Sequence, residues 1–161
     1  MSGAATSSVG AAPFEGFEWP VRVYWEDTDA GGVVYYANYL KFLERARTEW
    51  LRALGYSQQA LATDPGVLFM VVNLDVEYFR PARLDDPLRV SCAPERDGRV
   101  TMRFRQRIVR DSPARELLVA ANLRVACLDA RTLRPRRVPN FVPLAGSPAG
   151  ANADAVVGAS A

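Results

Sequence analysis

The sequence predicts an α+β fold in which an antiparallel sheet is wrapped around one long central helix. Apolar residues recur at three- and four-residue intervals between Tyr39 and Leu54, which indicates an amphipathic helix of about four turns. From residue 73 onward the apolar period changes to two, as is typical of strands with one buried face. Such a sheet must be covered, and the only long helix is its obvious cover.

The first half of the chain supplies the helices. A first strand is expected at residues 21–25, and the long helix is expected to begin at about residue 37 and to end at Gly55 in the C-cap role. Ser57 is expected to cap a short second helix that runs through residue 62.

The second half of the chain supplies the sheet. Alternating apolar and polar residues predict four strands, joined by short turns into an antiparallel meander. These strands include residues 73–78, 88–92, 100–105 and 117–127.

Length and composition indicate one domain. The chain has 161 residues, 49% of them hydrophobic, and the domain is expected at residues 17–144. Residues 1–16 and 145–161 are rich in small residues and are expected to be disordered tails. No apolar run approaches the roughly 18 residues of a membrane span, and the N-terminus lacks the pattern of a signal peptide. The expected location is therefore cytoplasmic.

The sequence contains no histidine, which excludes several kinds of chemistry. Ser-His-Asp and Cys-His catalysis, histidine-ligated metals and an imidazole base are all ruled out. Cys92 and Cys127 lie on the apolar sides of their predicted strands, so we expect packing rather than catalysis. The net charge of +2 gives no reason to expect nucleic acid as a partner.

One segment carries residues suited to a reaction. Glu26, Asp27 and Asp29 end the first predicted strand, and Gly31 and Gly32 precede the long helix. A carboxylate can act as nucleophile or base, glycines permit close backbone approach, and a helix N-terminus offers unpaired N–H groups to an oxyanion. A thioester needs little more, because its thiolate leaves without a strong general acid.

Two other interpretations of this segment remain open. The aspartates could be loop carboxylates that bind nearby backbone amides. Asp27 and Asp29 could instead bind a divalent metal ion, although no further carboxylate at ligand-like spacing appears in the adjoining helix. We expect neither a metal ion nor a separate cofactor.

The residues of this segment resemble a known family. The similarity is carried by Asp27-Thr28-Asp29-Ala30-Gly31-Gly32-Val33-Val34-Tyr35 and Phe42-Leu43-Glu44-Arg45-Ala46-Arg47, with further stretches at 37–39, 54–59, 76–78, 81–86 and 106–109. Together they cover about residues 20 to 140. The chain resembles the 4-hydroxybenzoyl-CoA thioesterase family, and within it the YbgC branch that is associated with the Tol-Pal envelope system.

The resemblance implies a hotdog fold and an acyl-CoA thioesterase. Asp29 would be the catalytic carboxylate, as nucleophile or as base on water, and the backbone N–H of Tyr36 would polarise the thioester carbonyl. Gly31, Gly32 and Val33 would shape the approach of the substrate. Family members form dimers with the active site between subunits, and tetramers are common, so a homodimer or homotetramer is expected.

Further substrate contacts are predicted around this core. Asn38 could orient Asp29 by a hydrogen bond. Arg96 and Arg99 are candidates for the phosphates of coenzyme A, which is part of the substrate. A basic stripe on the polar sides of two strands is either a second phosphate surface or a solvated outer face; it comprises Arg103, Arg105, Arg107 and Arg124.

A different class of function also remains open. The chain could be a non-hydrolytic module that binds acyl carrier protein or an envelope complex. Four arginines between residues 131 and 137 would suit an acidic partner of this kind, although such runs are more often simply solvated.

Overall fold

The structure, a computed structural model, describes residues 16–142. The predicted tails, residues 1–16 and 145–161, lie outside that range except for Gly16, so their disorder stays a prediction. The described elements are β1 (Phe17–Arg22), the 3-10 turn η1 (Trp25–Asp27), α1 (Asn38–Ala53), α2 (Gln58–Thr63), β2 (Val67–Tyr78), β3 (Pro87–Arg96), β4 (Thr101–Arg110) and β5 (Leu117–Asp129).

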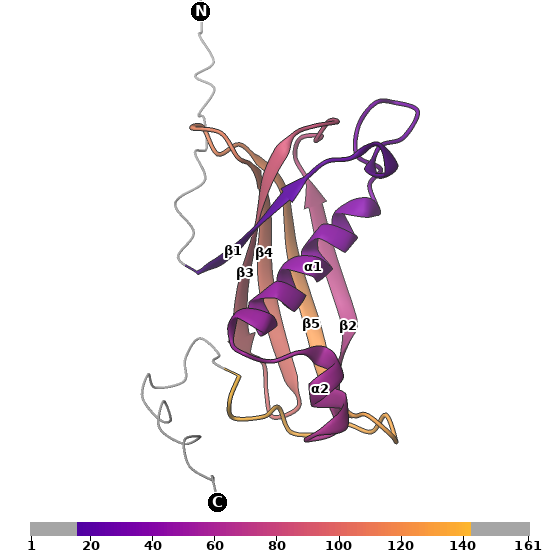
Figure 1. The fold of residues 1–161 in the computed structure, drawn as a ribbon, viewed down its shortest axis with the longest axis vertical. Helices are drawn as coiled ribbons and strands as arrows, with labels where there is room; N and C mark the ends of the chain where they lie inside the picture. The colour runs from indigo at the N-terminus through magenta and orange to yellow at the C-terminus, as the bar shows by residue number, and fades with distance from the viewer. Residues whose placement is uncertain (1–15, 143–161) are drawn as a thin grey trace, which may run out of the picture.

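The predicted fold class is confirmed. Five antiparallel strands form one curved sheet, and α1 crosses its concave face diagonally (Figure 1). The short helix α2 lies at the end of α1 and leads into β2, an edge strand (Figure 1). In the described part of the chain, no helix is long and apolar enough to cross a membrane.

The predicted meander of four strands is wrong in one respect. The strand order is β1-β3-β4-β5-β2, so only β3, β4 and β5 form a meander. β2 pairs with β5 rather than with β3, because β3 already has β1 on one side and β4 on the other. The chain therefore carries β2 and β3 at separate places in the sheet, and β2 has one unpaired edge.

The predicted bounds of the first strand are also wrong. β1 ends at Arg22, whereas the prediction extended it to residue 25. Asp27 causes the difference, because its carboxylate accepts the N–H of Tyr24 at 2.8 Å and closes the 3-10 turn η1. The chain thus leaves the sheet before the acidic cluster.

Helix α1 begins and ends close to the predicted positions. Asn38 is its first residue and Ala37 its N-cap. At the other end Gly55 has a φ of +89°, its N–H donates to the carbonyl of Arg52, and the next N–H, of Tyr56, donates to the carbonyl of Leu51. This is a Schellman motif, which favours glycine because of the left-handed backbone.

Helix α2 confirms the predicted cap. The hydroxyl of Ser57 accepts the N–H of Ala60 at 3.2 Å. The helix ends at Thr63, one residue beyond the predicted end.

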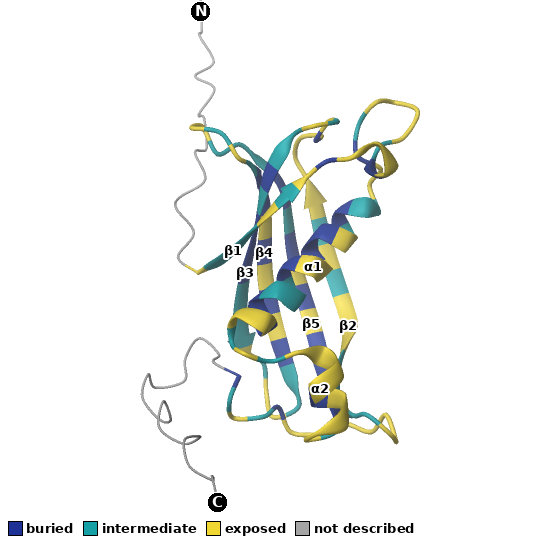
Figure 2. Cartoon of the chain, in the orientation of Figure 1, coloured by how far each residue is buried: buried dark blue, intermediate teal, exposed yellow. Residues whose placement is uncertain are grey.

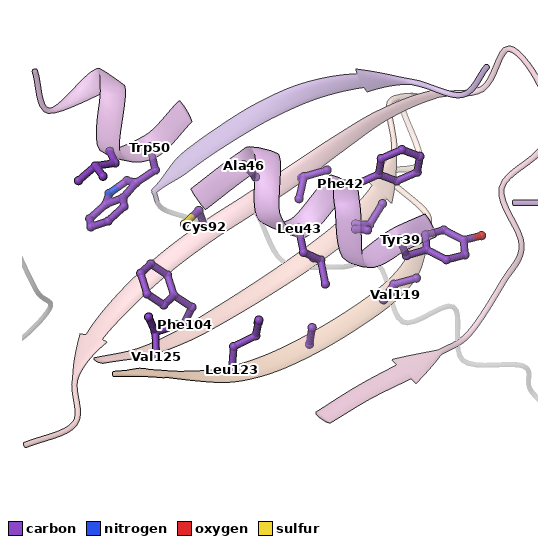
Figure 3. Packing of buried hydrophobic residues seen from close by; sticks show 14 of the residues in the cluster. Tyr39, Phe42, Leu43, Ala46, Trp50, Cys92, Phe104, Val119, Leu123 and Val125 are labelled. Carbon is purple, nitrogen blue, oxygen red and sulfur yellow. The ribbon is translucent and has the colours of Figure 1, made fainter. Parts of the chain in front are cut away.

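The core lies between α1 and the concave face of the sheet. Figure 3 shows the apolar side of α1 above the side chains of the strands, and Figure 2 shows the alternation of buried and exposed residues along them. From α1 the core receives Tyr39, Phe42, Leu43, Ala46, Trp50 and Leu51. This packing fixes the position of the helix N-terminus relative to the loop that precedes it.

The cysteines belong to this core, as predicted. Cys92 and Cys127 are buried free thiols. Burial raises the pKa of Cys92 to about 12 and also raises that of Cys127. Both thiols therefore stay protonated near neutral pH, which makes them poor nucleophiles.

Candidate active site

The acidic segment forms a compact loop beside the N-terminus of α1 (Figure 1). Thr28 and Val34 form an antiparallel bridge, and the N–H of Asp29 donates to the carbonyl of Val33 at 2.9 Å. The N–H of Gly32 returns to the carbonyl of Asp29 at 3.0 Å. Residues 28–34 thus form a small hairpin with Asp29 and the glycines toward its tip.

The loop is anchored to the sheet connection. The N–H of Val34 donates to the carbonyl of Ala82 at 2.9 Å, and the N–H of Ala82 donates to the hydroxyl of Tyr39 at 2.9 Å. Tyr39 is buried in the core, and burial raises the pKa of its hydroxyl. The hairpin and the first turn of α1 are therefore held against the same segment.

Asp27 and Asp29 have different environments. Asp27 is 3% exposed, and its carboxylate is used by the N–H of Tyr24. Asp29 is exposed, and among residues 16–142 its carboxylate accepts only the N–H of Gly31, at 2.8 Å through Oδ1. Asp27 is thus a structural carboxylate, whereas Asp29 can reach a substrate.

A sequence signal could have separated these two aspartates. Asp27 lies three residues after Tyr24, the spacing at which an acidic side chain reaches back to a backbone N–H at the start of a helical turn. The Asp-x-Asp pattern alone does not show this.

The two carboxylates do not form part of a larger acidic cluster. Among residues 16–142, no group of three or more histidine, cysteine, aspartate or glutamate side chains is arranged to hold a metal ion. In addition, Oδ2 of Asp27 already accepts a hydrogen bond from the backbone N–H of Tyr24.

Gly31 keeps the space beside Asp29 clear, and Gly32 allows the backbone of the turn. A Cβ atom at Gly31 would lie 3.0 Å from Oδ1 of Asp29, closer than side chains normally approach. Gly32 has a φ of +73°, in the left-handed region that favours glycine. Val33, also predicted to shape the approach, is half-buried and holds Asp29 through its carbonyl.

The predicted hydrogen bond from Asn38 to Asp29 is wrong. The Nδ2 of Asn38 donates instead to the backbone carbonyl of Asp27, at 2.9 Å. The same carbonyl accepts the N–H of Tyr35 at 2.9 Å. The 3-10 turn η1 aims this carbonyl at the start of α1, so Asn38 fixes the loop to the helix rather than orienting the catalytic candidate.

Tyr36 lies at the turn that starts α1. The N–H of Asn38 donates to the carbonyl of Tyr35 at 2.8 Å, so Tyr36 and Ala37 are the central residues of that turn. The backbone N–H of Tyr36 has no hydrogen-bond acceptor in the described part of the chain. It lies at the positive end of the helix dipole, where an oxyanion would be stabilised.

Tyr78 is a neighbour of this turn that the sequence did not reveal. Its hydroxyl, at the end of β2, donates to the carbonyl of Tyr36 at 2.9 Å. This bond orients the peptide unit that follows Tyr36. The sequence placed Tyr78 on a predicted strand and in one of the stretches that resemble the family, but no local pattern shows that the end of β2 meets the start of α1.

Arg96 and Arg99 do not lie near Asp29 within one chain. Pro87 pairs with Arg22 near the acidic loop, so β3 starts at that end of the sheet and reaches Arg96 at the other. Ten residues of strand span about 30 Å. Both arginines are exposed where β3 ends and the chain turns into β4. For this turn to lie beside the loop that holds Asp29, it would have to come from a second subunit.

The basic stripe lies on the outer face of the sheet, as its alternation predicted. Its four arginines are exposed, and three form ion pairs: Arg103 and Arg124 with Asp97, and Arg105 with Glu95. These pairs reduce the positive charge that the stripe presents. The solvated face is the simpler of the two interpretations.

A curved antiparallel sheet wrapped around one long helix is the hotdog fold of a class of thioesterases. A model of the thioesterase superfamily matches residues 31–116, more than half of the chain. The chain belongs to this superfamily. The crystal structure of a probable thioesterase from Bartonella henselae has the same fold, with a TM-score of 0.71, 33% identity, and coverage of 76% of this chain and 98% of that one.

The resemblance to the YbgC branch is confirmed as well. The acyl-CoA thioester hydrolase YbgC of Escherichia coli is 48% identical over 126 residues, which cover 78% of this chain and 92% of the relative. The acyl-CoA thioesterase YbgC of Haemophilus influenzae is 45% identical over 127 residues, which cover 79% and 91%.

Proposed function

We propose that the chain hydrolyses acyl-CoA thioesters to a free acid and coenzyme A. The observation that carries this proposal is the 48% identity to a YbgC acyl-CoA thioester hydrolase along 92% of that relative. The relatives' activity fits the site, which offers an exposed carboxylate beside a helix N-terminus. It also fits the absence of histidine, because thioester hydrolysis can proceed on a carboxylate and an oxyanion site.

The proposed mechanism uses Asp29 and the N–H of Tyr36. The thioester carbonyl oxygen accepts the Tyr36 N–H, which stabilises the negative charge that develops on that oxygen. As nucleophile, Asp29 forms a mixed anhydride while the thiolate of coenzyme A leaves, and water then cleaves the anhydride. As base, it takes a proton from the attacking water and passes it to the thiolate. Both routes return Asp29 to a carboxylate.

We infer that the active form is at least a homodimer joined through the free edge of β2. This edge strand has 12 residues, and its exposed apolar side chains include Met70, Val71 and Val72. A long, exposed apolar edge is a template for pairing with another strand. Pairing of two β2 strands would set a second subunit beside the exposed Asp29, and it would allow the partner's basic turn to approach.

Analytical ultracentrifugation of the purified chain tests this inference. We expect a mass of two or four times 17.7 kDa at micromolar concentration. Replacing Val72 by lysine should shift the chain toward the monomer, because charge on an edge strand opposes pairing. A monomer in the unmodified chain would contradict the inference.

The binding-module alternative rests on the segment from Arg131 to Arg137. All four of its arginines are exposed, although Arg136 pairs with Asp129 and the carbonyl of Gly66. This surface could meet an acidic carrier protein. The alternative requires binding without turnover, and the two functions can therefore be separated by kinetics.

A panel of short, long and aromatic acyl-CoA substrates tests the proposed function. We expect turnover of at least one substrate class, with unchanged rates in EDTA because no step needs a metal ion. Tight binding of acylated carrier protein with no hydrolysis of any substrate would favour the binding module instead. Rates that fall in EDTA and return with a divalent cation would show that the metal hypothesis for Asp27 and Asp29 is correct.

The cytoplasm is the proposed location. Cys92 and Cys127 are buried free thiols, which fit a reducing compartment. Cell fractionation with the native protein would settle the location, and recovery in the periplasm would contradict it.

A further inference from the structure

A cavity of about 170 Å³ lies between the second half of α1, the start of α2 and strands β2, β4 and β5. Its walls are mainly apolar. Figure 3 shows Trp50, Phe104 and Val125 together at this end of the core, far along α1 from Tyr39. An apolar cavity of about 150 Å³ is large enough to hold a benzene ring, so the apolar part of this one can hold the end of an alkyl chain.

One cation lines this apolar cavity. Arg47 is half-buried, and its Nη1 donates to Oε1 of Gln106 at 2.9 Å. Among residues 16–142, Arg47 forms no ion pair within 4.0 Å, and Gln106 is its only hydrogen-bond acceptor. A guanidinium has five N–H donors, so most of them remain available to a ligand in the cavity.

Gln106 holds Arg47 in this position. Gln106 is 1% exposed, and its Nε2 donates to the carbonyls of Leu43 and Ser91, at 3.1 and 3.2 Å. Its amide oxygen is thereby oriented toward Arg47. Burial lowers the pKa of Arg47, and the nearby charge of Glu44 offsets only part of that effect.

The other charged residue of the cavity lies at its rim. Glu44 is exposed, and its Oε1 accepts the hydroxyl of Thr48 at 2.6 Å rather than pairing with Arg47. A ligand carboxylate bound at Arg47 would also lie near the charge of Glu44 and be weakly repelled by it. The charge of Glu44 therefore provides an independent test of any anionic ligand.

The apolar side of β2 runs from this cavity toward the acidic loop. Phe69 and Val71 line the cavity, and a bulge at residue 72 keeps Leu74 and Val76 packed against the core. At the far end of the strand, Tyr78 bonds the carbonyl of Tyr36. Strand β2 therefore contributes both to the wall of the cavity and to the surroundings of the proposed oxyanion site.

The length of α1 from its first residue to Arg47 matches the length of a medium-length acyl chain. Arg47 lies nine residues after Asn38, or about 14 Å along the axis of α1 at about 1.5 Å per residue. Carbon–carbon bonds of about 1.5 Å advance an extended chain by about 1.3 Å each, so an acyl group of about ten carbons covers this distance.

We propose that this cavity receives the far end of the acyl group, and that Arg47 selects acyl groups ending in a carboxylate, the monothioesters of medium-chain dicarboxylic acids. The selection is a charge-assisted hydrogen bond formed in a largely apolar surrounding. This proposal rests on the proposed hydrolysis of acyl-CoA and names the class of acyl group that is hydrolysed.

The test compares two substrates that differ only at the far end: decanoyl-CoA and the mono-CoA thioester of decanedioic acid. In the unmodified chain, kcat/KM should be roughly tenfold higher for the dicarboxylic substrate. Arg47→Met should abolish this preference while decanoyl-CoA is still hydrolysed. Arg45→Met, a charge loss at an exposed position of the same helix, should leave the preference unchanged.

A second variant avoids any disturbance of Gln106. Arg47→Met removes the donor to a buried amide oxygen, so circular dichroism must show that it folds. Glu44→Gln leaves the contact between Arg47 and Gln106 intact and should raise the preference by about twofold or more. No preference in the unmodified chain, or one that survives in folded Arg47→Met, would overturn the proposal.

The outcomes separate this proposal from the proposed function. Hydrolysis of decanoyl-CoA without preference for the dicarboxylic substrate refutes the selection by Arg47 and leaves the thioesterase intact. If neither ten-carbon substrate is hydrolysed while another substrate of the panel is, the selection by Arg47 is refuted and the thioesterase stands. If no substrate of the panel is hydrolysed, the thioesterase proposal fails, and calorimetric binding of free decanedioate and decanoate decides the role of the cavity. Equal binding of the two acids would then overturn the proposed selection by Arg47.

Discussion

Replacing Asp29 by asparagine is expected to lower kcat for acyl-CoA hydrolysis by about 10³-fold or more. The amide has nearly the same shape as the carboxylate, and its oxygen can still accept the N–H of Gly31, so the hairpin should keep its geometry. An amide can neither attack the thioester nor take a proton from water. Because Asp29 is exposed, the free energy of unfolding should hardly change.

Asp27→Asn is the matched control for this prediction. Asp27 is buried, and an amide oxygen accepts the N–H of Tyr24 more weakly than a carboxylate does, so this change should reduce stability by about 1 to 3 kcal/mol while the folded protein keeps most of its turnover. Thermal unfolding and steady-state kinetics of both variants measure the two effects. Turnover near that of the unmodified chain in Asp29→Asn would remove Asp29 from the mechanism.

A single turnover in ¹⁸O-labelled water tests for the nucleophilic role of Asp29. Label in the Asp29 carboxylate afterwards shows an anhydride intermediate that water has cleaved at the side-chain carbonyl of Asp29. Label only in the product acid is expected when Asp29 acts as a base on water, and also when water cleaves an anhydride at the acyl carbonyl, so in that case trapping of the anhydride by hydroxylamine, as a hydroxamate, decides between the two roles. The panel of substrates identifies the best acyl group for this experiment.

Features that depend on neighbouring residues could be predicted from the sequence. The bounds of α1 follow from its apolar period and from Gly55, since a Schellman motif forms within one stretch of chain. Ser57 caps α2 through a bond that spans three residues. The burial of both cysteines follows in the same way from the alternation of their strands.

Features that depend on distant residues could not be predicted. The alternation of apolar and polar residues predicts which side of β2 is buried, but it does not predict which strand pairs with β2. The observed partner, β5, lies about fifty residues further along the chain. Its distance along the chain allows Asn38 to hydrogen-bond either aspartate. The 3-10 turn η1 orients the carbonyl of Asp27 toward Asn38, and that carbonyl is therefore the acceptor. The choice of Asp29 came from family resemblance, and its exposure beside a buried Asp27 now gives a physical reason for it.

Replacing Tyr36 by proline should lower kcat by about 10² to 10³-fold, because it removes one N–H from the proposed oxyanion site. The fold should tolerate the change. Tyr36 is the second residue of the turn closed by the N–H of Asn38 and the carbonyl of Tyr35, a position that favours proline. The lost N–H has no acceptor in the described part of the chain, and the carbonyl that Tyr78 binds remains.

Tyr36→Phe separates the backbone from the side chain. This variant keeps the N–H and loses only the hydroxyl, so its kcat should stay within about twofold of the unmodified value if the backbone is the donor. The proline variant should lose kcat with little change in KM, because the bond to the oxyanion is strongest in the transition state. A folded proline variant with unchanged kcat would exclude the Tyr36 N–H as the donor, whereas a large loss in Tyr36→Phe would assign the role to its hydroxyl.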